Sequence, residues 1–384
     1  MNILKKIYCR IFQTCFRIAL PVLPYREPEL IDGFKHVPEV MKKHHISHIL
    51  LVTDPGVYKL GLTKPLEKQL LKSEISCTIY KDTVANPTSA NIEEAKDFYL
   101  AHECQALLAF GGGSSMDCAK AVGARLARPN KPLAKMEGIL KIWHKLPLLI
   151  AVPTTAGTGS EVTPYAILTN HEKQTKKSIA SPCLFPTYAL LDAKYTKNLG
   201  LATTVNTAID SLSHSVEGMM SKRANVMADV IAKEAVKIIA STFDDLISGE
   251  LTEDDREKLL YASMLGGVVI SQTKTTAVHA MGYSLTYFKN IDHGRANGLL
   301  LGEFTKYIER NDKDRVKEIL SCMNLDSAEE FKNILVKILG DKEKFEKEEL
   351  ELYAEIAQNA GGTLNSMFVP SKDEILQIYV ESLM

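Results

Sequence analysis

Four side chains in the second half of the chain have the types and spacing of ligands for one metal ion. Asp210 and His214 are four residues apart in a helical pattern, which places a carboxylate and an imidazole on one helix face with Cβ atoms about 5–6 Å apart. His279 and His293, further along, offer two more rings. One oxygen and three nitrogen donors suit iron(II), zinc, nickel or cobalt. A single histidine is more often a surface or hydrogen-bonded core residue, and spacing alone does not decide between these readings.

A glycine-rich segment in the first half has the composition of a phosphate-binding turn. The apolar run 106–110 leads into Gly111 to Asp117 (GGGSSMD), and a helical pattern follows. Glycines allow a close approach to the backbone, and the free N–H groups of a helix N-terminus favour a pyrophosphate. Since the G-x-G-x-x-G spacing is absent, a tight turn without a ligand is an equal alternative for this segment alone. A second loop, Pro153 to Thr163 (PTTAGTGSEVT), is expected in the same crevice and favours a nucleotide.

Asp54 follows the first apolar run, in the sequence Val52-Thr-Asp-Pro-Gly-Val. An acid at a strand end can accept hydrogen bonds from ribose hydroxyls. It would also repel a 2′-phosphate by about 4 kcal/mol at 4 Å in an effective dielectric of about 20. This interpretation favours NAD over NADP. The alternative is that Asp54 only caps the helix that follows it.

The elements around these residues change in character along the chain. From about residue 30, short apolar runs alternate with helical patterns, which is typical of a parallel sheet covered on both faces. The runs are 48–54, 76–80, 106–110, 148–152 and 188–192. After about Leu199, helical periodicity dominates, as in 225–240 and 257–271, and the charged segment 309–351 is expected to form solvated helix faces. We expect an N-terminal segment 1–29, an α/β domain 30–197 and an all-helical domain 198–384.

Four motifs, in this order, resemble those of the iron-containing (group III) alcohol dehydrogenase family. They are GGGSxxD, PTTxGTGSEVT, DxxxHxxE and a later His followed by HGxAN, and the resemblance runs from about residue 30 to the end. It implies a Rossmann-like dinucleotide-binding domain with a parallel sheet, then an all-helical metal-binding domain, in a dehydroquinate synthase-like fold. Asp210, His214, His279 and His293 would bind the metal. The implied dinucleotide contacts are Asp54, Gly112, Gly113, Ser114, Asp117, Thr154, Thr155, Thr158, Thr163 and Lys176.

The resemblance implies an enzyme that moves a hydride between a nicotinamide cofactor and a small alcohol or aldehyde. NAD is favoured over NADP, and one divalent ion, iron(II) before zinc, acts as a Lewis acid. One alternative is a glycerol dehydrogenase-like or dehydroquinate synthase-like enzyme of the same fold. Another is a non-catalytic scaffold that binds metal or nucleotide.

Tyr283 is a departure from the family pattern. Many members carry a histidine four residues after the third ligand, near the nicotinamide, and this chain has Tyr283 there. A phenol can donate a hydrogen bond in a proton relay, but its reference pKa of about 10 makes it a poor base. We list Tyr283 as the candidate catalytic residue, with packing as its alternative role.

Composition limits the classes of partner. The 384 residues are 45% apolar and 24% charged, and 46 Lys plus Arg balance 47 Asp plus Glu, so broad nucleic-acid binding is not expected. Seven scattered cysteines without C-x-x-C spacing indicate neither a disulfide framework nor a thiolate zinc site. We expect a cytoplasmic homo-oligomer.

The N-terminal segment has the pattern of a basic amphipathic helix. Its apolar positions Leu4, Ile7, Ile11, Cys15 and Ile18 are interspersed with Lys5, Lys6, Arg10 and Arg17. Packing against a neighbouring subunit or domain is favoured over contact with an anionic membrane.

Overall fold

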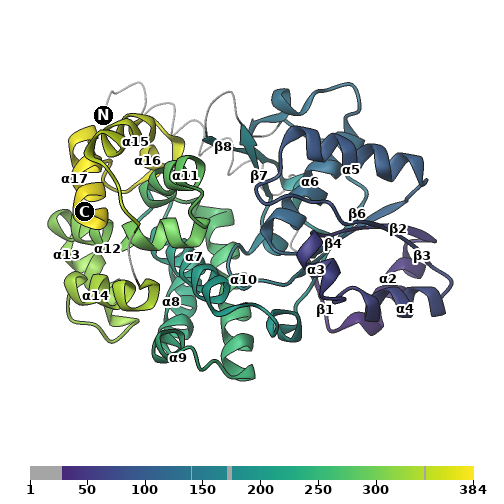
Figure 1. Cartoon of the computed structure of the whole chain (residues 1–384), viewed down its shortest axis with the longest axis horizontal. Helices are drawn as coiled ribbons and strands as arrows, with labels where there is room; N and C mark the ends of the chain where they lie inside the picture. The colour runs from purple at the N-terminus through teal and green to yellow at the C-terminus, as the bar shows by residue number, and fades with distance from the viewer. Residues whose placement is uncertain (1–27, 140, 171–174, 341–342) are drawn as a thin grey trace.

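Residues 28–139, 141–170, 175–340 and 343–384 are described by a computed structural model (Figure 1). Six parallel strands form the main sheet in the order β1-β9-β6-β4-β2-β3. Their bounds are β1 (Glu29–Ile31), β2 (His48–Val52), β3 (Ser76–Tyr80), β4 (Ala106–Gly111), β6 (Leu148–Pro153) and β9 (Tyr188–Leu190). Five of them are the strands that the apolar runs predict. The edge strand β1 escapes that pattern because only one of its three residues, Ile31, is buried.

Two of the predicted strands end earlier than their apolar runs. Strand β2 ends at Val52 because Asp54 caps the helix α3 (Pro55–Lys59). Strand β9 ends at Leu190 because Asp192 caps the short 3-10 helix η5 (Ala193–Thr196). A capping acid stops each strand, since its side chain satisfies the first N–H groups of the following helix.

Helices cover both faces of the main sheet, as its apolar strands require. Leu50 and Val52 pack towards α5 (Ser89–Ala101) and α6 (Gly113–Ala127). Their neighbours Ile49 and Leu51 point to the other face, where α2 and α4 lie, because side chains alternate along a strand. The remaining elements of this half are α2 (Val37–Lys43), α4 (Lys64–Lys72), η1 (Phe34–His36), η2 (Leu133–Met136), η3 (Ser160–Val162) and η4 (Pro182–Leu184).

A second, three-stranded sheet was not predicted. Its strands β5 (Gly138–Ile139), β8 (Thr175–Ala180) and β7 (Tyr165–Asn170) lie in the order β5-β8-β7, with β7 and β8 antiparallel. Strand β8 begins with Thr, Lys and Lys and is mostly half-buried, so it has no apolar run to reveal it. This sheet matters for the site because β8 lies against α11 (Ala277–Lys289) of the helical half and brings Lys176 there.

From α7 onward the chain is helical, as predicted, and its helices lie on the opposite side of the molecule from β2 and β3 (Figure 1). One buried apolar core joins these helices. Their bounds are α7 (Leu201–Met219), α8 (Val226–Ala240), α9 (Phe243–Ser248), α10 (Glu253–Thr273), α11 (Ala277–Lys289), α12 (His293–Asn311), α13 (Lys313–Ser321), α14 (Ala328–Leu339), α15 (Lys347–Gln358), α16 (Gly361–Asn365) and α17 (Lys372–Leu383).

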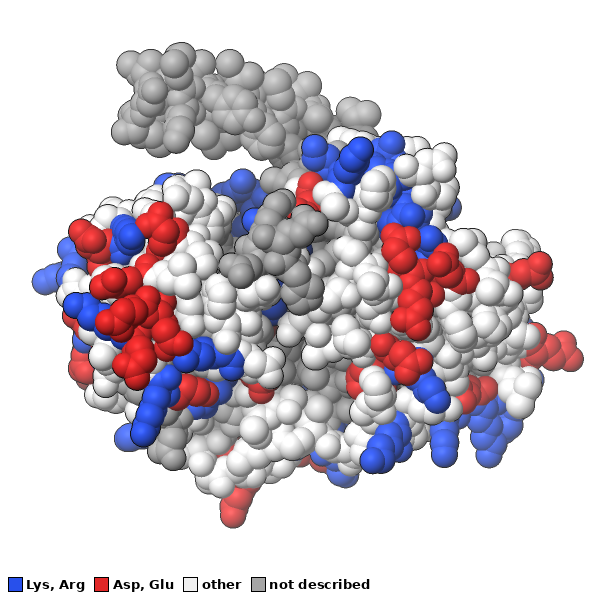
Figure 2. Space-filling view, turned by 45° about the horizontal axis from the view of Figure 1, so that its top comes forward, with Lys and Arg blue, Asp and Glu red and all other residues white. Residues whose placement is uncertain are grey.

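The basic amphipathic helix expected before residue 20 lies outside the described residues. Within the described ranges, no helix combines the length and the apolar character needed to cross a membrane. Figure 2 shows one face of the molecule, on which acidic and basic side chains occur beside one another over both halves. On that face the two signs are mixed, in keeping with the balanced composition.

Candidate functional site

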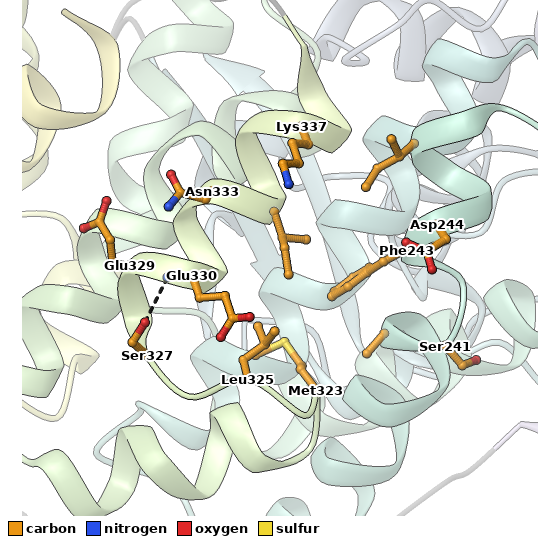
Figure 3. Close-up of a pocket in the computed structure, with 13 residues that line it drawn as sticks. Ser241, Phe243, Asp244, Met323, Leu325, Ser327, Glu329, Glu330, Asn333 and Lys337 are labelled. Atoms are coloured by element: carbon orange, nitrogen blue, oxygen red, sulfur yellow. Dashed lines mark hydrogen bonds between the residues drawn. The ribbon is translucent and has the colours of Figure 1, made fainter.

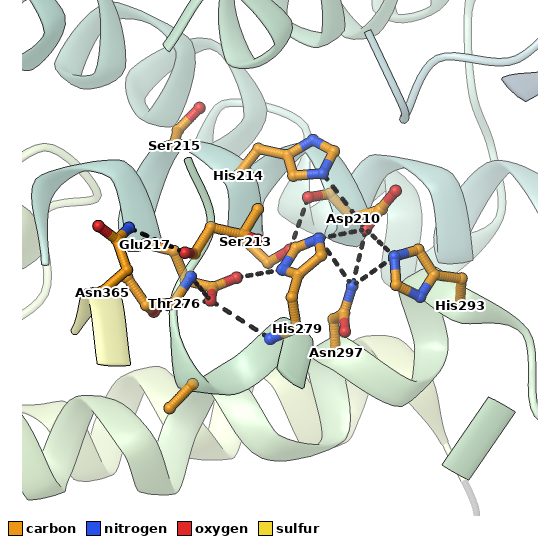
Figure 4. A network of polar contacts seen from close by, with 12 residues as sticks. Asp210, Ser213, His214, Ser215, Glu217, Thr276, His279, His293, Asn297 and Asn365 are labelled. Atoms are coloured by element: carbon orange, nitrogen blue, oxygen red, sulfur yellow. Dashed lines mark hydrogen bonds and ion pairs between the residues drawn. The ribbon is translucent and has the colours of Figure 1, made fainter. Parts of the chain in front are cut away.

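Three helices bring the four predicted metal ligands together (Figure 4). Asp210 and His214 lie on one face of α7, as their spacing predicts. His279 lies in the first turn of α11, and His293 is the first residue of α12. Three of these side chains are nearly inaccessible to solvent, and His293 is about three-quarters buried.

The donor atoms converge on one carboxylate oxygen. The Oδ1 atom of Asp210 lies 3.8 Å from Nε2 of His214, 3.6 Å from Nε2 of His279 and 3.9 Å from Nε2 of His293. The donor atoms of Asp210, His279 and His293 all lie within 4.8 Å of one another, and His214 stands slightly outside that group. Two ligands about 2.1 Å from one ion in tetrahedral geometry are about 3.4 Å apart. The three distances to Asp210 Oδ1 are within about 0.5 Å of this separation, so the residues fit a single divalent ion after small side-chain movements.

Asn297 lies among the donor atoms, although it was not singled out from the sequence. Its Nδ2 atom lies 2.9 Å from Asp210 Oδ1, 3.2 Å from His279 Nε2 and 3.3 Å from His293 Nε2. It is fully buried one helical turn after His293. A Cβ on Gly282 would overlap the Asn297 amide oxygen, so Gly282 makes room for this side chain. The HGxAN motif contained the signal, but its asparagine had no expected partner.

The electrostatics of the cluster follow from burial and from two carboxylates. Burial alone would lower the pKa of His279, but Glu217 and Asp210 outweigh it and raise that pKa to about 9. Burial and the nearby Lys176 ammonium hold the pKa of His293 well below its usual range. Burial opposes ionisation of Asp210, yet the surrounding histidines keep its pKa far below the ordinary value. The cluster attracts positive charge, as a cation site must.

Contacts between α7 and the start of α12 fix the position of His293. The Asn206 side chain donates a hydrogen bond of 2.8 Å to Asp292 Oδ2. A Cβ on Gly294 would overlap the Asn206 carbonyl, so only glycine permits this approach of the two helices. His293, between Asp292 and Gly294, is thereby held against the helix that carries Asp210.

The predicted nucleotide loops meet at the carboxyl edge of the main sheet. Helix α6 begins immediately after β4, and Gly112, its N-cap, provides no side-chain cap to the first N–H groups. A Cβ on Gly112 would approach Thr155 to 3.3 Å, and one on Gly113 would approach Thr158 to 2.6 Å. A helix N-terminus bordered by glycines and hydroxyls is a suitable anion site.

Asp54 lies at the same edge, at the end of β2. Its Oδ1 atom accepts hydrogen bonds from the N–H groups of Gly56 (2.9 Å) and Val57 (3.0 Å). This oxygen therefore caps helix α3, as the alternative interpretation predicts. Its Oδ2 atom lies 3.5 Å from the Ser115 hydroxyl, beside the glycine turn. Capping of the helix by one oxygen and an orientation of the other oxygen towards a nucleotide are thus compatible in this structure.

A cation lies near the same edge of the sheet. At the end of β3, the Lys81 ammonium lies 5.1 Å from the ring of Tyr58 in α3.

Two of the predicted dinucleotide contacts are used inside the protein. Asp117 accepts hydrogen bonds from the Ser160 hydroxyl (2.7 Å) and the Ile167 N–H (2.9 Å). The Thr163 hydroxyl and carbonyl both accept from the ammonium group of Lys120. Lys120 was not singled out from the sequence, although it is fully buried. Its ammonium also donates to the Tyr165 carbonyl and to both oxygens of Ser160.

Two further predicted dinucleotide contacts, Ser114 and Thr154, lie beside the glycine turn after β4. The Ser114 hydroxyl accepts a hydrogen bond of 3.1 Å from the Asn86 N–H. The Thr154 N–H donates to the Gly111 carbonyl at 3.0 Å, which continues the pairing of β4 and β6, and its side chain is buried.

Tyr283 and Lys176 lie between the two groups of residues. The Tyr283 ring stacks on the His293 ring with centroids 5.3 Å apart and an interplanar angle of 15°. The Lys176 ammonium lies 5.8 Å from the centre of the Tyr283 ring. This proximity was not predicted from the sequence. Burial lowers the pKa of Lys176 to about 8, although Asp210 and Asp117 act in the opposite direction. Burial also raises the pKa of Tyr283, with Asp210 and Glu217 adding to the effect.

The loop after β6 joins the nucleotide edge to the metal cluster. A Cβ on Gly157 would lie 2.6 Å from that of Thr207, three residues before Asp210 in α7. A Cβ on Gly159 would lie 2.5 Å from the Gly267 Cα in α10. Through these close contacts, the loop that borders the glycine turn packs directly on the helices α7 and α10 of the helical half.

A separate cavity of about 640 Å³ lies between α9 and α14 (Figure 3). Its wall includes Phe243, Met323 and Leu325, with Glu329 and Lys337 among the polar residues. It shares no residue with the histidine cluster or the glycine turn, so it contributes nothing to their chemistry.

Comparison with known proteins places this arrangement in a family. Residues 31–193 match the family described as iron-containing alcohol dehydrogenase, and residues 204–383 match its C-terminal region. Alcohol dehydrogenase 4 of Schizosaccharomyces pombe is 31% identical over 77% of this chain and 71% of its own length.

Solved structures confirm the predicted fold. An iron-containing alcohol dehydrogenase from Thermotoga maritima is 32% identical and superimposes with a TM-score of 0.85 over 94% of this chain and 98% of that one. A sulfoacetaldehyde reductase from Bifidobacterium kashiwanohense, solved in complex with NAD+, is 25% identical with a TM-score of 0.83 over 93% of this chain and 98% of that one. Since family matches cover both halves of the chain, and the solved structures share its fold almost throughout, the chain belongs to the iron-containing alcohol dehydrogenase family.

Proposed function

We propose that this protein is an NAD(H)-dependent and metal-dependent alcohol dehydrogenase or aldehyde reductase for a small alcohol and its aldehyde. The observation that carries the proposal is the convergence of one carboxylate and three imidazoles beside the glycine-lined edge of the parallel sheet. Membership of the family makes the chain an oxidoreductase acting on CH–OH groups.

We assign the metal ligands to Asp210, His214, His279 and His293, with iron(II) as the expected ion and zinc as the alternative. Gly112, Gly113, Thr155 and Thr158 would border the pyrophosphate. The remaining assigned contacts are Asp54, Ser114, Asp117, Thr154, Thr163 and Lys176. Of these, Asp117 and Thr163 would act indirectly, because their side chains hold the loop that carries Thr158.

When bound, a divalent ion supplies Lewis acidity that polarises a carbonyl or stabilises an alkoxide, and the nicotinamide supplies or accepts the hydride. The residues of this chain orient both groups. Helices α7, α11 and α12 fix the donor atoms, and the loop after β6 holds the nucleotide edge against α7 through Gly157. Lys176 and Tyr283 lie beside His293, with the Tyr283 ring stacked on the His293 ring.

The direct test is oxidation of NADH with a panel of aldehydes by protein loaded with iron(II) or zinc, compared with metal-free protein. We expect turnover that depends on the metal and is highest for a short aldehyde. Tight binding of metal and NADH without turnover of any aldehyde or alcohol would instead indicate the non-catalytic scaffold.

Replacing Tyr283 with phenylalanine tests whether its hydroxyl takes part in proton transfer. Because burial raises the pKa of its phenol, and because a phenylalanine would keep the stacking on His293, Tyr283→Phe should lower turnover by less than about tenfold. The loss of a true acid–base group would cost about 10²-fold or more. The measurement is the pH–rate profile of variant and wild type at equal metal content. A large fall in turnover together with a lost basic limb would show that the hydroxyl relays the proton.

The charge of Asp54 is expected to determine the choice between NADH and NADPH. Wild-type protein should prefer NADH to NADPH, and Asp54→Gly should narrow the gap in kcat/KM by on the order of 10²-fold, because it removes the repulsion of a 2′-phosphate. Lys81, whose ammonium lies 5.1 Å from the ring of Tyr58 in α3, would then be one cation available to that phosphate.

Asp54→Asn is the matched variant, since it keeps an oxygen for the N–H groups of Gly56 and Val57 and removes only the charge. Both variants should shift in the same direction. Equal efficiency of the wild type with NADPH and NADH would show that Asp54 does not face the ribose.

Further aspects of the protein are proposals of the same kind. We infer a cytoplasmic homo-oligomer without nucleic-acid partners. At the start of α8, Val226, Met227 and Val230 are 78%, 68% and 61% exposed, an apolar surface that a second subunit could cover. We propose that the α/β domain comprises residues 30–197 and the all-helical domain residues 198–384.

A further inference from the structure

Glu217 lies on the same face of α7 as Asp210 and His214 but is not among the proposed ligands. It is seven residues after Asp210, so both side chains point towards α11. Its side chain is 0% exposed. Burying a carboxylate is costly unless hydrogen bonds and charge compensate it. The contacts of Glu217 must therefore account for its place.

All these contacts lead to the start of α11 (Figure 4). The Oε1 atom of Glu217 accepts hydrogen bonds from the Thr276 N–H (2.8 Å), the Thr276 hydroxyl (2.7 Å) and the His279 N–H (3.3 Å). The Oε2 atom contacts Nδ1 of the His279 ring. Glu217 thus holds both the backbone and the ring of one proposed ligand.

This contact determines which nitrogen of His279 is free. An ionised carboxylate only accepts hydrogen bonds, so Nδ1 of His279 must carry the hydrogen. In the neutral ring, Nε2 then keeps its lone pair. That atom points to the centre of the site, 3.6 Å from Asp210 Oδ1 and 3.2 Å from Asn297 Nδ2. Outer carboxylates of this kind orient histidine ligands in metal sites generally.

We propose that Glu217 is a positioning residue that fixes the tautomer and ring orientation of His279 and supplies the second negative charge that balances a divalent ion in this buried site. With the four proposed ligands, Asp210 provides one charge and three neutral rings provide none. Glu217 brings the total to that of a dication. The inference rests on the proposed metal site.

The decisive variant is Glu217→Gln, which keeps the size of the side chain. Its amide nitrogen would donate to Nδ1 of His279 and favour the tautomer with hydrogen on Nε2, where the ion binds. We expect the zinc affinity, measured by competition with a chromophoric chelator, to fall by about 10–100-fold. The rise in melting temperature that zinc produces should shrink with it.

Glu303→Gln is the matched control. Glu303 is also a buried glutamate on a helix, 1% exposed, but its partners are the Lys306 and Lys332 ammonium groups and not a proposed ligand. Its loss should lower the melting temperature of the metal-free and zinc-loaded protein equally and leave zinc affinity unchanged. A merely structural Glu217 would behave in the same way.

Two further variants keep the proposal testable if Glu217→Gln does not fold. Thr276→Val removes one donor to Oε1 and should weaken zinc binding several-fold, while Thr276→Ser should restore it. In metal-free protein with 15N-labelled histidine, at a pH above the His279 pKa of about 9 so that the ring is neutral, the wild type should carry the ring hydrogen on Nδ1 of His279 and Glu217→Gln should carry it on Nε2.

Unchanged zinc affinity and an unchanged His279 signal in Glu217→Gln would overturn the role of Glu217. The proposed function fails by a different result, namely wild-type zinc binding that His279→Ala leaves intact. The two failures are therefore distinguishable in one series of titrations.

Discussion

Replacing His279 with alanine is expected to abolish stoichiometric metal binding and to lower turnover by about 10³-fold or more, because Lewis acid stabilisation of the transition state is worth several kcal/mol. His279 Nε2 is the histidine donor nearest to Asp210 Oδ1, at 3.6 Å, and the ring is buried.

The measurements are metal content by elemental analysis and kcat with NADH and a reactive aldehyde. His102→Ala is the control for loss of a histidine, since that ring is on the surface and bonds only to the Phe98 carbonyl among the described residues. It should retain metal and activity. Full metal content and full turnover in His279→Ala would refute the ligand assignment.

The second large effect is expected for Lys120→Met. The buried ammonium of Lys120 donates to oxygens of Ser160, Thr163 and Tyr165, and methionine leaves them without this donor. A buried acceptor that loses its donor costs about 1–3 kcal/mol, and oxygens of three residues lose one here. The single tryptophan, Trp143, lies in the same half of the chain, so its fluorescence during urea unfolding reports on this loss.

The variant should also bind NADH more weakly, because Lys120 holds the loop that carries Thr158. Lys96→Met is the matched control in the same half. Lys96 pairs with Glu93 and Asp97 near the surface, where such a pair contributes about 0–1 kcal/mol. Equal urea midpoints for the two variants would contradict the role assigned to Lys120.

The stability difference has a predictable pH dependence. Burial lowers the pKa of Lys120 from 10.5 to about 8. Between these values the unfolded chain binds the proton and the folded chain does not, so this group makes the wild type more stable as the pH rises. The stability that this deprotonation adds is fully present above the pKa of the unfolded chain, 10.5. It is lost as the pH falls through the folded pKa of about 8. The gap between wild type and Lys120→Met should therefore widen from pH 8 to about pH 10.

The sequence predicted those features that depend on neighbouring residues, namely strands, helix faces and the turn before α6. Apolar runs identified the strands of the main sheet except β1, since a strand covered on both faces must be apolar along its length. Helical spacing placed Asp210 and His214 on one face of α7. The glycines after β4 indicated an open helix N-terminus, which α6 has.

The tertiary structure alone decided which polar side chains are partners. Asn297, Glu217 and Lys120 are buried because groups far away in sequence satisfy them, and no spacing along the chain reveals such partners. The small sheet that brings Lys176 to Tyr283 has no apolar run of its own. Ligand types can be read from a sequence because they depend on chemistry, whereas the contacts that orient them depend on long-range packing. The motifs predicted which four side chains meet at one ion, whereas the distances of the three imidazoles from Asp210 Oδ1 are visible only in the folded chain.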